Sequence, residues 1–263
     1  MNGATEPERI ALVIGASRGI GAAAARALAG AGHAVAIVCL SRRKEAEAVL
    51  AECGGRGATF LCDVRDPAAV HGLVRDVEAK LGPVAVAVHS PNLSFPIGPF
   101  WQQPWPEVKT KLDQELGAFH ALASAVVPGM IARRFGRVIL VSSMMSRHPS
   151  PGFATHAAAK SALDAAVLTL ARELGVHGVT ANIVAPGVVE SASTATIAPE
   201  VRAWVERATP GARLGVPDDL GQVIAWLASD AARWVTGQYL QMDGGLGGSL
   251  PFASDAIIRQ GAR

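Results

Sequence analysis

Two residues that can exchange protons stand four positions apart in an alanine-rich stretch, His156-Ala-Ala-Ala-Lys160. The apolar pattern from about 155 to 177 predicts a helix, and residues four apart project from the same helix face. An imidazole can act as a general acid or base near neutral pH. Because the neighbouring Lys160 ammonium disfavours an imidazolium, we expect His156 to be neutral, a competent base and a poor acid.

A second group of residues can bind phosphate. The apolar run at 10–14 predicts a buried strand, and Gly15, Gly19 and Gly21 follow it where the chain turns into an alanine-rich helix. Backbone N–H groups at the start of such a helix attract anions, and the missing side chains let a pyrophosphate approach. The alternative, a purely structural turn, is disfavoured by the strand and helix on either side.

These residues belong to an alternating series of predicted strands and helices. Strands are expected at 10–14, 33–40, 58–64, 84–90, 136–143, 179–186 and 238–243, and the main later helices at 106–134, 155–177 and 217–229. Repeated strand–helix units with continuous apolar strands predict a doubly wound parallel sheet, the Rossmann α/β fold. We expect a single domain over residues 1–245, with a substrate loop at about 187–215 and a tail at 246–263.

Composition narrows the class of protein. Half of the 263 residues are apolar and the formal net charge is only +2, which supports a large core and argues against a nucleic-acid-binding surface. Cys39, Cys53 and Cys62 lack the spacing of a metal site or a disulfide framework, so no metal is expected. The polar N-terminus is unlike a signal peptide, and from the sequence we expect no apolar run long enough to span a membrane. We therefore expect a cytoplasmic protein that does not bind membranes.

In order and spacing these segments resemble the short-chain dehydrogenase/reductase family, and the first half is similar to 3-oxoacyl-carrier-protein reductases. The resemblance covers roughly residues 9–245 and rests on the glycine motif at 15–21, Asp63-Val64, the segment at 182–187, and the C-terminal signatures at 213–217 and 236–245. It implies a nicotinamide dinucleotide cofactor. The residues it assigns to the cofactor are Gly15, Ser17, Arg18, Gly19, Ile20, Gly21, Asp63, Val64, Ser90, Lys160, Pro186, Gly187 and Val189.

The end of the second strand bears on the choice of cofactor. Members of the family that prefer NAD place a carboxylate there, to bind the ribose hydroxyls. This chain has no acid in that segment and instead carries Ser41 and Arg42, with Arg18 in the glycine turn. Guanidinium groups bind phosphate oxygens in a bidentate manner, so we predict NADP(H), the alternative being that these arginines are only solvated.

The resemblance also implies a catalytic set of Ser, Tyr-x-x-x-Lys and an Asn from the long preceding helix. Ser143 and Lys160 match, and Lys160 would bind the nicotinamide ribose, but His156 stands at the tyrosine position and Gln114 at the asparagine position. Tyr239, in the last predicted strand, is the only tyrosine, so no other phenol can replace the missing one.

Three explanations fit these departures. The protein can be a reductase of a ketone in which His156 or a water relay supplies the proton while Ser143 binds the carbonyl. It can be an enzyme of the same fold redirected to cyclisation, dehydration or isomerisation with His156 as base. It can also be an inactive cofactor-binding or partner subunit.

The expected substrate is hydrophobic, an acyl or polyketide-like molecule, because apolar side chains occur on the loops that the resemblance places around it. These are Phe95, Trp101, Met144, Met145, Phe153 and Trp204. The resemblance further implies a homotetramer, or a dimer, formed through the helices at 106–134 and 155–177 and the last strand. The tail at 246–263 could dock on a neighbouring subunit.

Overall fold

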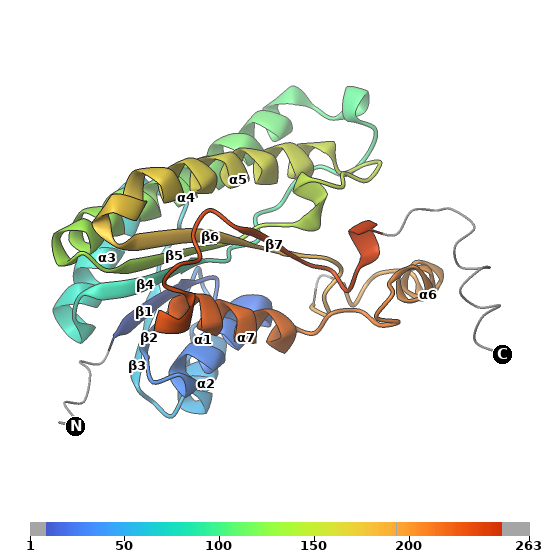
Figure 1. The fold of residues 1–263 in the computed structure, drawn as a ribbon. Coiled ribbons are helices and arrows are strands. Elements are labelled where there is room, and N and C mark those ends of the chain that lie inside the picture. The colour runs from blue at the N-terminus through green and yellow to red at the C-terminus, as the bar shows by residue number, and fades with distance from the viewer. Residues whose placement is uncertain (1–8, 193, 249–263) are drawn as a thin grey trace.

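A computed structural model describes residues 9–192 and 194–248 (Figure 1). The strands are β1 (Ile10–Ile14), β2 (Ala34–Cys39), β3 (Gly57–Leu61), β4 (Val84–His89), β5 (Gly136–Val141), β6 (Val179–Pro186) and β7 (Tyr239–Met242). The α-helices are α1 (Gly19–Gly30), α2 (Arg43–Glu52), α3 (Pro67–Leu81), α4 (Trp105–Arg133), α5 (Ala154–Leu174), α6 (Pro199–Ala208) and α7 (Pro217–Ala228). Short 3₁₀ turns include η1 (Phe100–Gln102) and η2 (Met144–Ser146).

The seven strands form one parallel sheet in the order β3-β2-β1-β4-β5-β6-β7. The predicted doubly wound α/β fold is therefore confirmed. The strand order reverses between β1 and β4, which are paired through Ile14 and His89 at their carboxyl ends. A sheet of this type has its ligand crevice beyond the carboxyl ends of the strands at this reversal.

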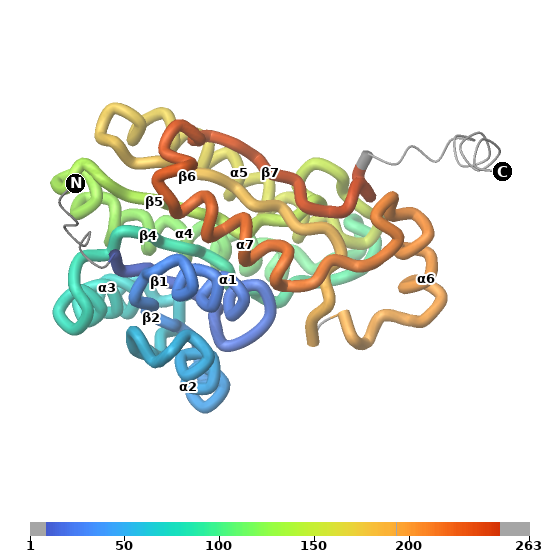
Figure 2. Tube along the Cα trace, turned by 60° about the horizontal axis from the view of Figure 1, so that its bottom comes forward, coloured from blue at the N-terminus to red at the C-terminus, as the bar shows by residue number. Residues whose placement is uncertain are grey.

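Alternation along each strand divides the core into two layers. In β1, Leu12 and Ile14 face a cluster shared with α3, α4 and α5, whereas Ala11 and Val13 face a cluster shared with α1 and α7. Figure 1 shows these two helical layers on opposite sides of the sheet, and Figure 2 shows α1 and α7 side by side. Burial on both faces explains why the strands are apolar throughout.

Helix α4 corrects one expectation from the sequence. It is long and apolar enough to cross a membrane by length and composition, although no such segment was expected. Within the structure its apolar residues have a different explanation, because Phe119, Leu122 and Met130 are buried in the layer between the helix and the sheet.

Several strands end earlier than predicted, and these differences shape the site. β3 ends at Leu61 and β5 at Val141, which leaves Asp63, Val64 and Ser143 in the loops beyond the strands. The predicted tail at 246–263 lies outside the described residues except for its first three, so its docking remains a prediction. Cys39, Cys53 and Cys62 are buried free thiols.

Candidate active site

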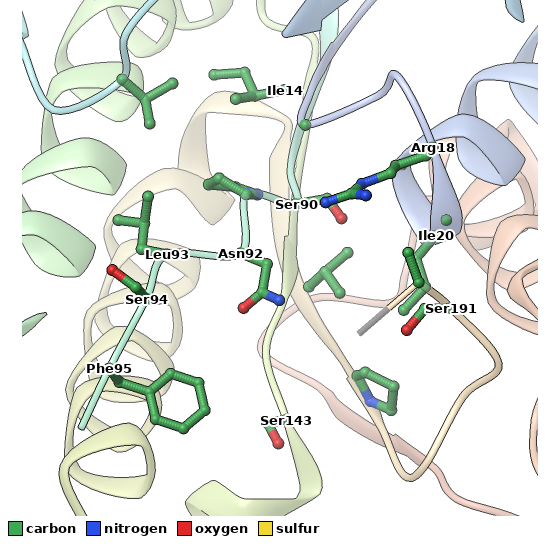
Figure 3. A pocket seen from close by; sticks show the side chains of 18 of the residues that line it. Ile14, Arg18, Ile20, Ser90, Asn92, Leu93, Ser94, Phe95, Ser143 and Ser191 are labelled. Atoms are coloured by element: carbon green, nitrogen blue, oxygen red, sulfur yellow. The ribbon is translucent and has the colours of Figure 1, made fainter. Parts of the chain in front are cut away.

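A cavity of about 1000 Å³ opens at the carboxyl ends of the central strands, beyond the reversal between β1 and β4 (Figure 3). Every residue that the sequence assigned to the cofactor or to catalysis lines it. They are Gly15, Ser17, Arg18, Gly19, Ile20, Gly21, Ser41, Arg42, Asp63, Val64, Ser90, Gln114, Ser143, His156, Lys160, Pro186, Gly187 and Val189. The fold thus brings together, in one crevice, residues from both halves of the chain.

The turn between β1 and α1 is shaped for an anion. Gly15 and Gly19 adopt φ angles of 79° and 58°, and a Cβ on Gly15 would lie 2.6 Å from the Ser90 carbonyl oxygen. A Cβ on Gly21 would lie 2.3 Å from the Gly15 oxygen. Helix α1 begins without a side-chain cap, so its first N–H groups are available to a ligand phosphate. This cradle fits the pyrophosphate of a dinucleotide.

Guanidinium groups gather at one end of the cavity, called the adenosine end because the resemblance assigns this end to the adenosine of the cofactor. Arg18 extends from the glycine turn into the cavity (Figure 3), and Arg42 lines the same end while pairing with Glu45 at 3.0 Å. Sequence reasoning missed Arg65, which also lines the cavity and binds both carboxylate oxygens of Asp63 at 2.8 and 2.6 Å. These bonds hold the pKa of Asp63 below its ordinary value. The end is therefore positively charged even with Asp63 ionised.

Ser143 and His156 lie at the other end of the cavity. The Ser143 hydroxyl caps η2 by accepting a hydrogen bond from the Met145 N–H at 3.2 Å, so its own proton can be donated to a ligand. The His156 ring stacks on Phe95 with centroids 4.4 Å apart, and its Nδ1 is buried without a hydrogen-bond partner. Because the ring lines the cavity, a ligand can reach it only through Nε2.

Burial, together with the ammonium groups of Lys160 and Lys111 and against the opposing effect of Glu115, lowers the pKa of His156 to about 4. The imidazole is therefore neutral at neutral pH, in agreement with its predicted state. The sequence argument named only Lys160, whereas in the structure burial is the first cause and a second lysine contributes.

The residue of α4 that contacts Lys160 is Glu115, which the sequence analysis did not single out. Glu115 Oε2 accepts a hydrogen bond from Lys160 Nζ at 3.3 Å, and its Oε1 accepts one from Lys111 Nζ at 2.5 Å. Lys111 also donates to the Leu93 carbonyl at 2.7 Å. Gln114, one position earlier, lies a hundred degrees away around the helix and lines the cavity instead.

His89 completes this buried group from the sheet. It is fully buried at the end of β4, its ring packs edge-on against Phe119 at 5.6 Å, and neither ring nitrogen has a hydrogen-bond partner in the structure. Burial, with a further contribution from Lys160, lowers the pKa of His89 to about 3. His89 is accordingly neutral, and Lys111, Glu115 and Lys160 are the charged members of the group.

Only part of the expected apolar wall is present. Phe95, Met145 and Phe153 line the cavity as predicted, joined by Leu93 and others that the sequence did not suggest. Three expected members do not line it, namely Trp101, Met144 and Trp204. Trp101 and Trp204 are instead 83% and 58% exposed.

Tyr239 lies near the site without entering it. Its hydroxyl donates to the Ser143 carbonyl oxygen at 3.1 Å and is 3.1 Å from the Ser146 hydroxyl. The residue is not part of the cavity lining. Among the described residues, no group of three His, Cys, Asp or Glu side chains is arranged to hold a metal ion.

Comparison with known proteins identifies the family to which the chain belongs. The family model described as enoyl-(acyl carrier protein) reductase matches residues 15–247, which is most of the chain. Together with the fold and the cavity, this match places the chain in the short-chain dehydrogenase/reductase family, whose members are oxidoreductases that use a nicotinamide cofactor.

Two similar relatives are 3-oxoacyl-[acyl-carrier-protein] reductases. The 3-oxoacyl-[acyl-carrier-protein] reductase FabG of Escherichia coli strain K12 is 32% identical over 240 residues, which cover 90% of this chain and 97% of that protein. The enzyme of the same name from Staphylococcus aureus strain Mu50 is 33% identical over 242 residues, covering 90% and 97%.

Solved structures agree with this fold. A putative gluconate dehydrogenase from Agrobacterium tumefaciens superposes with a TM-score of 0.87 at 25% identity, covering 92% of this chain and 97% of that one. Acetoin dehydrogenase from Enterobacter cloacae, at 23% identity, has a TM-score of 0.85 over 94% and 98% of the two chains. The protein is thus an enzyme of the oxidoreductase type, related to ketoacyl reductases and dehydrogenases.

Proposed function

We propose that this enzyme is an NADP(H)-dependent ketoreductase acting on an apolar β-keto acyl or polyketide-like substrate, with His156 at the position where the family has its proton-donating tyrosine. The observation that carries the proposal is the single cavity, which joins a phosphate cradle at one end to Ser143, His156 and Lys160 at the other. The names of the relatives support an acyl substrate. Neither the family nor these relatives support the alternative of cyclisation, dehydration or isomerisation, or that of an inactive subunit.

The residues present suit the cofactor along its whole length. Gly15, Gly19 and Gly21 would hold the pyrophosphate, and Lys160 would bind the nicotinamide ribose. Arg18, Ser41 and Arg42 would bind a 2′-phosphate, and Arg65, which lines the same part of the cavity, would be a fourth polar group there. When bound in reduced form, such a cofactor supplies the hydride.

The chain's own residues would manage the oxygen of the substrate. Ser143 would donate its hydroxyl proton in a hydrogen bond to the carbonyl oxygen and so fix its orientation. His156 Nε2 would exchange a proton with that oxygen, directly or through one water. With a pKa of about 4, His156 is protonated in about one molecule in a thousand at pH 7. Ketone reduction should therefore be slow at neutral pH and faster in acid.

The apolar wall supports the substrate class. Leu93, Phe95, Met145 and Phe153 line the same cavity as the catalytic residues. Aliphatic and aromatic surfaces of this kind bind chains or rings better than small polar ketones.

We also propose that the enzyme is cytoplasmic and self-associates through α4 and α5, as a tetramer or a dimer. A second hollow of about 580 Å³ lies between these helices, with an apolar lining that includes Leu112, Leu116 and Leu170. Leu116 is 42% exposed there, which suits a surface that is covered by another subunit. Light scattering that gives the mass of a monomer would contradict this proposal.

The cofactor assignment can be tested by titrating the protein with NADPH and with NADH and comparing the dissociation constants. We expect NADPH to bind about tenfold more tightly or better, because its extra phosphate meets Arg18 and Arg42. Equal constants would refute the NADP(H) assignment, and a preference for NADH would reverse it. The Arg42→Ala variant should lose part of the preference while binding of NADH stays close to that of the wild type.

A further inference from the structure

Three charged side chains are buried together beneath the catalytic end of the cavity. Lys111 and Glu115 are each 1% exposed at the side chain and lie one turn apart on α4, and Lys160 reaches them from α5 with 5% exposure. The two oxygens of Glu115 are divided between the two lysines. We propose that Glu115 is a positioning residue: it anchors the Lys160 ammonium at the floor of the pocket, and Lys111 is the counter-ion that lets a carboxylate be buried there. The proposal rests on the function proposed above, because Lys160 matters to the cofactor only within that function.

Stability alone does not explain the arrangement. A buried ion pair contributes little more than well-packed apolar residues of the same volume, since the cost of desolvation offsets the attraction. This group contains a carboxylate and two ammonium groups where α4 and α5 would otherwise pack through apolar side chains. Its members surround the one lysine that lines the cavity, which points to a role in the site.

Glu115 is the negatively charged member of this group. Burial would raise the pKa of Glu115, but Lys160 and Lys111 outweigh it, and the pKa lies below its ordinary value. Glu115 is therefore an anion at neutral pH. Because one carboxylate faces two ammonium groups, the group has a net positive charge with His89 and His156 neutral beside it.

Lys111 has a second contact that links the charged group to the pocket wall. It donates to the Leu93 carbonyl at 2.7 Å, and its ammonium lies 5.0 Å from the centre of the Phe95 ring, on which His156 stacks. The floor of the pocket and one wall are thus held by the same side chain. Replacing Lys111 alone would disturb both, so the test must include the double variant.

The test compares Glu115→Gln with the double variant Lys111→Met/Glu115→Gln, and adds the single variant Lys111→Met for the NMR titration. A matched control is Glu107→Gln/Lys109→Met, which removes one charge of each sign from the exposed face of the same helix. Melting temperature and the dissociation constant of NADPH would be measured for each. The free-protein titration of the His156 ring would be followed by NMR.

We expect Glu115→Gln to lower the melting temperature by about 10 °C, because it leaves two buried ammonium groups without a carboxylate. The double variant should recover most of that loss, since it removes the uncompensated charge. In both variants the dissociation constant of NADPH should stay about tenfold above the wild-type value, because Lys160 has lost its anchor. The control should match the wild type in both measurements.

If the double variant regains stability and also binds NADPH like the wild type, Glu115 only fills the core and the proposal is overturned. The NMR titration distinguishes failure of the positioning role of Glu115 from failure of the proposed function, because the titration needs no cofactor. Lys111→Met should move the titration of His156 to higher pH, since one of the ammonium groups that oppose its protonation is gone, and adding Glu115→Gln should move it back. Identical titrations in all these proteins would show that the charged group does not act on the pocket, whatever the protein binds.

Discussion

The two ends of the cavity are built on different principles. At the end proposed to bind the adenosine and the phosphates, the glycine turn is shaped by close backbone approaches, and charged side chains beside it are exposed, as in the Arg42–Glu45 pair. At the catalytic end the site depends on side chains from β4, α4 and α5, most of them buried and charged. The first end depends on the absence of a Cβ at its key glycines and on exposed guanidinium groups, whereas the second depends on buried charges.

The largest effect should come from adding a methyl group at the adenosine end. In Gly21→Ala the new Cβ would lie 2.3 Å from the Gly15 oxygen, so the turn must shift and its N–H groups lose their alignment. We expect the dissociation constant of NADPH to rise on the order of 100-fold. Gly30→Ala, at the far end of the same helix where a Cβ meets nothing within 4 Å, is the control and should bind normally. Normal binding by Gly21→Ala would mean that this turn does not hold the cofactor.

A smaller effect is expected from Tyr239→Phe near the catalytic end. The change removes the hydrogen bond to the Ser143 carbonyl, which is worth about 1 kcal/mol and corresponds to a fall of about 2–4 °C in melting temperature. Turnover should stay within about twofold of the wild type, because the phenol lies outside the cavity lining. A loss comparable to that of a catalytic residue would show that the only tyrosine takes part in the reaction after all.

The difference between the two ends also explains which parts of the site could be predicted from the sequence. The β1–α1 turn is local, so the strand, the glycine spacing and the helix could be identified directly, and the apolar runs predicted the parallel sheet. The difference between Gln114 and Glu115 is not local, because adjacent helical residues point in directions about 100° apart and the packing of α4 on α5 decides which one meets Lys160. The opposite charges of Lys111 and Glu115 at the i, i+4 spacing did not single them out, because the exposed pair Lys109 and Asp113 has the same spacing in the same helix.

The exposed aromatics show a second limit. Trp101 and Trp204 were expected on loops near a substrate, but the structure places Trp101 in η1 and Trp204 in α6, and the sequence pattern does not show whether such a side chain faces the cavity or solvent. Phe95 lines the cavity in a segment that Lys111 contacts through the Leu93 carbonyl, two residues earlier. That contact joins segments eighteen residues apart and could not be inferred from periodicity.

The account's central claim is that His156 handles the proton in a pocket that keeps it neutral. It is tested most directly by the pH dependence of kcat for reduction of a β-keto thioester, followed through the absorbance of NADPH and corrected for acid decay of the cofactor. For the wild type we expect the rate to rise about tenfold per pH unit as pH falls from 7 toward 5, because the protonated fraction of a group with a pKa of about 4 grows in that proportion. His156→Tyr should be about tenfold or more faster at pH 7, with this rise removed, since a phenol donates without first becoming charged. A flat profile that is the same in the wild type and in His156→Phe would contradict the claim.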